Sequence, residues 1–228
     1  MKKNSYIGIS FIILIFGIYV AFNFKNQFSK TYKTENKEES ETLVTFEKVP
    51  DFSFTNQEGK TITNKDFDGK VYVLEFFFTT CPTICPIMND NMMLVQEQYY
   101  GNKDFGIASI SINPEHDTPE ILKKYAEDHK IEHKNWHLLT GPKDKVYELS
   151  NTGFKLYANE NPEAEGGFEH SGLFALIDKN GNIRSRKIEE GGFENPIKFY
   201  DGLDKKHIQM LKEDIEILLK ENKDGSNN

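Results

Sequence analysis

The chain has 228 residues, of which 37% are hydrophobic, and it carries a formal net charge of −8 at pH 7. This length suits one domain of ordinary size with a real core, plus short appendages. The acidic balance argues against a nucleic-acid partner, because phosphate binding needs clustered Lys and Arg, and the sequence has none outside stretches of mixed charge.

The N-terminal residues predict a membrane anchor. After Lys2 and Lys3, the uncharged segment 7–24 is long enough to span a membrane. Bulky residues follow it in place of a small-residue cleavage site, so we expect residues 1–25 to form a single-pass anchor that is not cleaved. The two lysines favour a cytoplasmic N-terminus, which places the globular domain on the periplasmic, extracytoplasmic side of a bacterial inner membrane.

Three segments follow the predicted anchor. Residues 26–44 are polar and charged, and they predict a flexible linker that sets how far the domain reaches from the membrane. Residues 45–222 carry the hydrophobic patterns of one domain, and residues 223–228 predict a disordered tail. The sequence shows no internal repeat and no second domain.

Strands and helices are expected to alternate through the domain. In chain order we predict a hairpin of residues 49–54 and 61–63, a strand over 71–78 that is buried on both faces, a helix from Ile87 to Tyr99, a strand over 105–112, a helix from Asp117 or Thr118 to Ala126, and a strand over 136–140. The domain is completed by a helix from Gly141 that Gly153 ends, extended residues 154–157, an acidic surface loop over 158–167, a hairpin of 171–177 and 182–188, and a helix from Leu203 to Leu218. This order predicts an α/β sandwich with a central mixed sheet flanked by helices.

The chain has only two cysteines, Cys81 and Cys85, and both lie between the strand over 71–78 and the next helix. Residues spaced by four at a helix start face the same side, so a disulfide or a shared metal is within reach. Backbone N–H groups at a helix start stabilise thiolates, so we expect both cysteines to be more acidic than a free thiol. Pro86 is expected to loosen or kink this end. A disulfide across so small a loop would constrain the unfolded chain little, which favours a working pair.

The six histidines are possible further metal ligands. Three of them are spaced by four, but their surroundings lack helical periodicity and predict a loop leading into a strand: His129, His133 and His137. His116 and His207 stand near helix starts, and we expect them at the surface. His170 stands at the entrance to a strand after the acidic loop, from which it can reach the cysteine helix.

A calcium loop is a competing interpretation of residues 178–189. Acidic and amide residues fall at positions 1, 3, 5 and 12 of an EF-hand count: Asp178, Asn180, Asn182 and Glu189. However, Ile183 occupies the position that needs glycine, and alternating residues on both sides predict strands. We therefore expect a β-hairpin with a tight Asn180–Gly181 turn.

Four ordered motifs resemble the Sco (SenC) family of copper-binding proteins that help to assemble cytochrome c oxidase. They are FTTCPTICPIM, INPEHDTPEIL, NWHLLTGPKDKVYELSNTGF and FEHSGLFALIDKNGNIR. The resemblance implies a thioredoxin-like fold on a single membrane anchor, with copper held by Cys81, Cys85 and His170. The chain departs from the family where it has His116 in place of a frequent Arg, Asn113 in place of Asp, and Glu169 in place of the Asp that often precedes the histidine.

Two thiolates and one imidazole suit Cu(I), whereas structural zinc usually needs a fourth protein ligand. Cu(II) can also bind if water or a nearby oxygen fills a fourth position. The resemblance implies a metallochaperone that delivers copper to the binuclear copper centre of the oxidase. Its expected partners are the copper-bearing oxidase subunit, other copper chaperones and thiol oxidoreductases.

Two other functions fit the same residues. A thiol-disulfide oxidoreductase would attack with Cys81, resolve with Cys85 and reduce target cysteines before metal insertion. Thioredoxin-like reductases usually separate the pair by two residues, whereas three separate this pair, and disulfide exchange does not need His170. A copper or redox sensor that acts through a partner protein is the other alternative.

Overall fold

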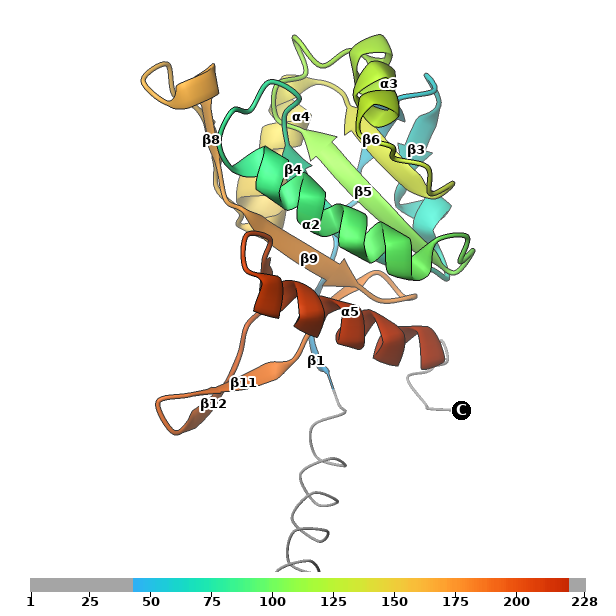
Figure 1. The fold of residues 1–228 in the computed structure, drawn as a ribbon, viewed down its shortest axis with the longest axis vertical. Helices are drawn as coiled ribbons and strands as arrows, with labels where there is room; N and C mark the ends of the chain where they lie inside the picture. The colour runs from blue at the N-terminus through green and yellow to red at the C-terminus, as the bar shows by residue number, and fades with distance from the viewer. Residues whose placement is uncertain (1–42, 222–228) are drawn as a thin grey trace, which may run out of the picture. The chain divides into compact units, whose positions relative to one another are not determined.

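The computed structural model describes residues 43–221 (Figure 1). The predicted anchor at 1–25, linker residues 26–42 and the predicted tail at 223–228 lie outside the described residues. Within the described part of the chain, every helix is too short or too polar to cross a membrane.

A mixed sheet forms the centre of the domain, as the sequence predicts. Its three central strands run parallel: β4 (Val71–Phe77), β5 (Phe105–Ser111) and β6 (Trp136–Thr140). The order along the sheet is β1-β10-β9-β4-β5-β6-β2-β3, and β13 pairs with β9. The outer strands are β1 (Val44–Lys48), β2 (Ser53–Asn56), β3 (Thr61–Thr63), β9 (Leu173–Ile177), β10 (Asn182–Ser185) and β13 (Tyr200–Asp201), all of them paired antiparallel.

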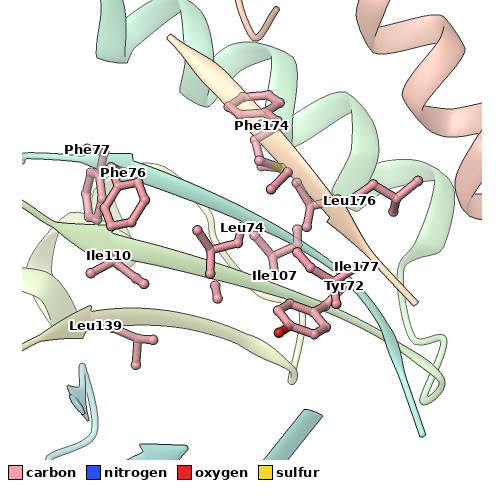
Figure 2. Packing of buried hydrophobic residues seen from close by; sticks show 14 of the residues in the cluster. Tyr72, Leu74, Phe76, Phe77, Ile107, Ile110, Leu139, Phe174, Leu176 and Ile177 are labelled. Carbon is pink, nitrogen blue, oxygen red and sulfur yellow. The ribbon is translucent and has the colours of Figure 1, made fainter. Parts of the chain in front are cut away.

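The apolar runs of β4 and β5 reflect burial on both faces of the sheet. All seven residues of each strand are buried, as expected for central parallel strands that are covered on both sides. Phe76, Ile110 and Leu139 are register neighbours on β4, β5 and β6, and Figure 2 shows their side chains next to one another. Because β4 and β5 run parallel, this packing fixes their carboxyl ends side by side at the same end of the strands.

Helices cover both faces of the sheet. In Figure 1, α2 (Ile84–Tyr99) and α5 (Lys205–Lys220) lie in front of the sheet and α4 (Lys143–Tyr147) lies behind it, whereas α3 (Pro119–Asp128) contacts β6. The cap of α3 is Thr118, whose hydroxyl accepts the Ile121 N–H. Leu203 precedes α5, so the predicted start of the last helix is two residues early.

The helix after Gly141 does not end at Gly153. A π-helical turn, η2 (Glu148–Phe154), continues α4, and the left-handed residue Lys155 with φ 58° ends it. A Cβ at Gly153 would lie 2.9 Å from Pro50 Cγ. This glycine therefore allows close packing against the N-terminal segment, and it does not cap the helix.

Two hairpin arms were not predicted. The expected acidic surface loop contains β7 (Ala158–Glu160), which pairs with β8 (Phe168–His170) around η3 (Glu165–Gly167). The expected strand over 182–188 divides, because β10 ends at Ser185 and β11 (Lys187–Glu190) pairs with β12 (Phe193–Pro196). Figure 1 shows the β11–β12 arm projecting from the body of the domain. The opening hairpin of β2 and β3 is confirmed, and the short turn η1 (Asn64–Phe67) follows it.

Candidate metal centre

Cys81, Cys85 and His170 meet beyond the end of β4. Their ligand atoms all lie within 4.8 Å of one another, and no other group of three His, Cys, Asp or Glu side chains among residues 43–221 is gathered in this way. Cys81 lies in the turn after β4, Cys85 in the first turn of α2, and His170 at the end of β8. Both cysteines are free thiols and buried, with exposed fractions of 8% and 3%.

The turn between β4 and α2 brings the two sulfurs together. The Cys81 N–H donates to the Phe78 carbonyl at 3.2 Å, and the Cys85 N–H donates to Cys81 Sγ at 3.5 Å. Cys81 therefore lies outside the helix, and its sulfur accepts a hydrogen bond from a first-turn N–H of α2 that has no partner within the helix. Pro86 is the third helical residue, where its missing N–H has no partner to lose, and α2 runs on without the interruption we expected.

The pKa values of the two thiols are shifted in opposite directions. The neighbouring Cys85 thiol lowers the pKa of Cys81 to about 3, and His170 and the Cys85 N–H add to this effect. The pKa of Cys85 is raised, first by Cys81 and then by burial. The expectation of two acidic cysteines is thus confirmed for Cys81 and wrong for Cys85, because one proton is held between two close thiols.

The ring of His170 is oriented by its main-chain neighbour. Its Nδ1 lies 3.1 Å from the Ser171 carbonyl and its Nε2 lies 3.2 Å from Cys85 Sγ. When Nδ1–H donates to that carbonyl, Nε2 keeps its lone pair and faces the sulfurs, which is the tautomer that a metal requires. Phe78 supports the ring edge-on, with a centroid distance of 5.9 Å.

The other histidines stand elsewhere. The predicted loop trio does not form a ligand group: His133 is buried with Nε2 3.1 Å from the Tyr99 carbonyl, His137 packs on Phe67, and His129 is exposed. His116 is half-exposed beside Asp117. His207 is partly buried and accepts the Asp201 N–H, so its expected surface position is only partly right.

Residues 178–185 form the turn and the second strand of the expected hairpin, and Glu189 lies on β11. Asp178 Oδ1 accepts the N–H groups of Asn180 and Asn182, each at 2.9 Å. Its other oxygen pairs with Arg184 at 3.1 Å. The carboxylate is thus used to close the turn between β9 and β10.

A buried carboxyl beside the site was not predicted. Glu75 points from β4 into the core, accepts a hydrogen bond from Ser109 Oγ at 2.6 Å, and has its pKa raised to about 7 by burial. It lines a cavity of about 10 Å³ together with Cys85 and Asn89, which is room for one water molecule. Its charge within an apolar strand run is the signal that could have drawn attention to it.

The SCO1/SenC family model matches residues 24–195, which is more than half of the chain. The chain belongs to the SCO1/SenC family. The SCO1 protein homolog of Bacillus subtilis (strain 168) is 35% identical over 137 residues, which are 59% of this chain and 70% of that protein. This family membership rests on the sequence match and agrees with the resemblance carried by the four motifs.

Solved structures share the thioredoxin-like α/β fold. BsSco, described as a member of the Sco family of cytochrome c oxidase assembly proteins with a disulfide switch, is 27% identical with a TM-score of 0.61, over 78% of this chain and 96% of that one. ScoI of Bradyrhizobium japonicum, solved with copper bound, is 24% identical with a TM-score of 0.56, over 73% of this chain and 99% of that one. The second likeness supports the fold alone.

Proposed function

We propose that this SCO1/SenC family member is a copper metallochaperone that delivers copper to the binuclear copper centre of cytochrome c oxidase. Cys81, Cys85 and His170 are the proposed ligands. The observation that carries the proposal is the convergence of two thiol sulfurs and one imidazole Nε2 within 4.8 Å. Two soft sulfurs with one imidazole suit Cu(I), because zinc usually takes a fourth protein ligand.

The partner and the location belong to the same proposal. The copper-bearing oxidase subunit is the proposed acceptor, and other copper chaperones or thiol oxidoreductases are the proposed donors and reductants. Residues 1–25 are proposed to anchor the protein in a bacterial inner membrane, with the domain of residues 45–222 on the periplasmic side. Support comes from family membership and from the uncharged segment 7–24.

The asymmetric thiols favour a second function, disulfide exchange. A lowered pKa at Cys81 and a raised pKa at Cys85 suit an attacking thiolate and a resolving thiol. Reduction of target cysteines would transfer two electrons from this pair to the target disulfide, leaving a Cys81–Cys85 disulfide. His170 is not needed for that exchange, so it separates the two functions.

The test is Cu(I) binding by the full-length chain in competition with a Cu(I) chelator. We expect Cys81→Ser and His170→Ala each to weaken binding by more than about tenfold, while His170→Ala still forms the disulfide. His129→Ala is the matched control, because His129 is exposed and outside the three-ligand group. Unchanged Cu(I) affinity in His170→Ala would remove the third ligand, and thiol reduction of a test disulfide without copper dependence would favour the exchange function.

A further inference from the structure

We propose that Asp117 is a positioning residue that holds Cys81 in place through Thr79. Asp117 stands in the turn before α3, 36 positions after Cys81, and Thr79 is two residues before that cysteine. The consequence for copper rests on the proposed function, whereas the consequence for the thiol can be measured without metal.

The Asp117 carboxylate gathers donors from three segments. Its Oδ2 accepts the Thr79 N–H at 3.0 Å and the Ser111 hydroxyl at 2.5 Å. Its Oδ1 accepts the Thr79 hydroxyl and lies 2.9 Å from His116 Nδ1. The carboxylate therefore ties the end of β5 and the start of α3 to the segment that leads from β4 to Cys81.

Burial makes these bonds hard to give up. Asp117 is 0% exposed, and among the ion pairs of residues 43–221 its only partner is the imidazole of His116, which is 46% exposed. A buried carboxylate that loses its donors is strongly destabilised, because no water replaces them. If Thr79 moved, the carboxylate would lose two of its four donors, so Thr79 is held where it is.

The fixed Thr79 leaves little freedom for Cys81. The Cys81 N–H donates to the Phe78 carbonyl, and Phe78 is itself buried at the end of the strand run. The four-residue turn from Phe78 to Cys81 is thus held at Phe78 by packing and at Thr79 by Asp117. The geometry directs Cys81 Sγ toward the Cys85 N–H and the imidazole of His170.

Asp214 is a matched control within the same domain. It is also 0% exposed and also accepts several hydrogen bonds, but its partners are Arg186 and Tyr200, and it stands on α5. Asp214→Asn removes the charge of an equally buried carboxylate, so it reproduces a general loss of stability without touching the segment before Cys81.

The experiment measures alkylation of Cys81 by N-ethylmaleimide in the metal-free, full-length chain. A Cys85→Ser background makes Cys81 the only thiol. Alkylation is compared at one temperature well below the melting temperature of every variant, so that the intrinsic reaction rate is the same and global unfolding contributes little. We expect Asp117→Asn to raise the rate several-fold and Asp214→Asn to leave it unchanged. Equal rates in Asp117→Asn and its parent, or equal acceleration in both Asn variants, would overturn the proposal.

Copper binding gives the second readout, in the chain with both cysteines. Asp117→Asn is expected to weaken Cu(I) binding by about ten- to a hundredfold, as supporting residues of metal ligands commonly do, while Asp214→Asn leaves it unchanged. If Asp117→Asn does not fold, Thr79→Val removes one donor and should shift both readouts in the same direction by less. A wild-type chain that binds no Cu(I) would refute the proposed function, and the alkylation rates would still decide the role of Asp117.

Discussion

The metal centre and the α5 region both bury carboxylates, but they compensate them differently. On α5, Asp214 pairs with Arg186 at 2.6 Å and accepts the Tyr200 hydroxyl. At the metal centre, Asp117 and Glu75 depend on hydroxyls, one backbone N–H and one half-exposed imidazole. Among residues 43–221, neither forms an ion pair with Lys or Arg.

The two ways of compensating a buried carboxylate have different consequences for stability and for function. A guanidinium compensates a buried carboxylate and makes the contact resistant to pH, since Arg stays charged. Neutral donors leave the charge more costly, and such costs are concentrated at functional sites in many proteins. The α5 region therefore fastens the fold with an ion pair, while the carboxylates around the cysteines are held by neutral donors at an energetic cost.

The largest expected effect comes from removing the cation that pairs with Asp214 at α5. Arg186→Met leaves Asp214 buried without its cation, and we expect the free energy of unfolding to fall by about 3 to 4 kcal/mol. This value lies at the low end for a broken buried ion pair, because Arg186 is itself partly exposed. Urea denaturation of the full-length chain measures this change. Cu(I) affinity should stay as in the parent, and Arg186→Lys should recover part of the stability. A loss of copper affinity in Arg186→Met would show that the two regions are coupled.

The next effect concerns Glu75. Its pKa is about 7 in the folded protein and near 4.5 as a reference, so the folded state holds a proton that the unfolded state releases. Stability is therefore lost as pH rises from about 4.5 through 7. Glu75→Gln removes this loss, and it should be more stable than the parent at pH 8 by on the order of 2 to 3 kcal/mol but similar near pH 4.

The measurement is the free energy of unfolding of metal-free protein from pH 4 to pH 8. The difference between Glu75→Gln and the parent should grow with pH, since other groups titrate equally in both. Glu127→Gln is the control, because Glu127 is an exposed carboxylate of α3, and its difference should stay flat. A flat difference for Glu75→Gln as well would mean that Glu75 is ionised at no cost, and the contrast with Asp214 would fail.

The sequence predicted the metal centre more fully on the cysteine side than on the histidine side. Cys81 and Cys85 follow a recognisable buried strand and precede a recognisable helix, so local patterns place them. His170 was assigned as a ligand through the family resemblance, because its approach depends on the β7–β8 arm, whose strands carry no strong alternation. The two strands of the arm pair over only three residues each. So short a hairpin is not stable by itself and needs contacts with the rest of the domain.

The buried carboxylates show a different limit. Glu75 lies in an apolar run, and its single charge does not change the strand prediction. Asp117 matches a helix cap as well as Thr118 does, and the two residues are distinguished by the tertiary contacts of Asp117 with Thr79 and Ser111. Charge burial depends on partners far away in the sequence, which short-range patterns do not report.

The smallest expected effect sharpens the comparison at the β7–β8 arm. Gly166 has φ 84°, and a Cβ there would lie 2.9 Å from Pro82 Cδ, in the turn between the cysteines, and 3.1 Å from Phe78. Gly167 has φ 83° and would meet nothing within 4 Å. Alanine at either position should cost about 1 kcal/mol of stability through backbone strain, measured by urea denaturation.

Only Gly166→Ala should also disturb the metal centre, because its methyl group pushes the arm away from Pro82 and carries His170 with it. We expect Cu(I) affinity to fall several-fold in Gly166→Ala and to remain at the parental value in Gly167→Ala. Because both variants share the same strain, the difference between them isolates the contact of the arm with the cysteine turn. Equal affinities would mean that the arm adjusts freely and that His170 reaches the sulfurs without this support.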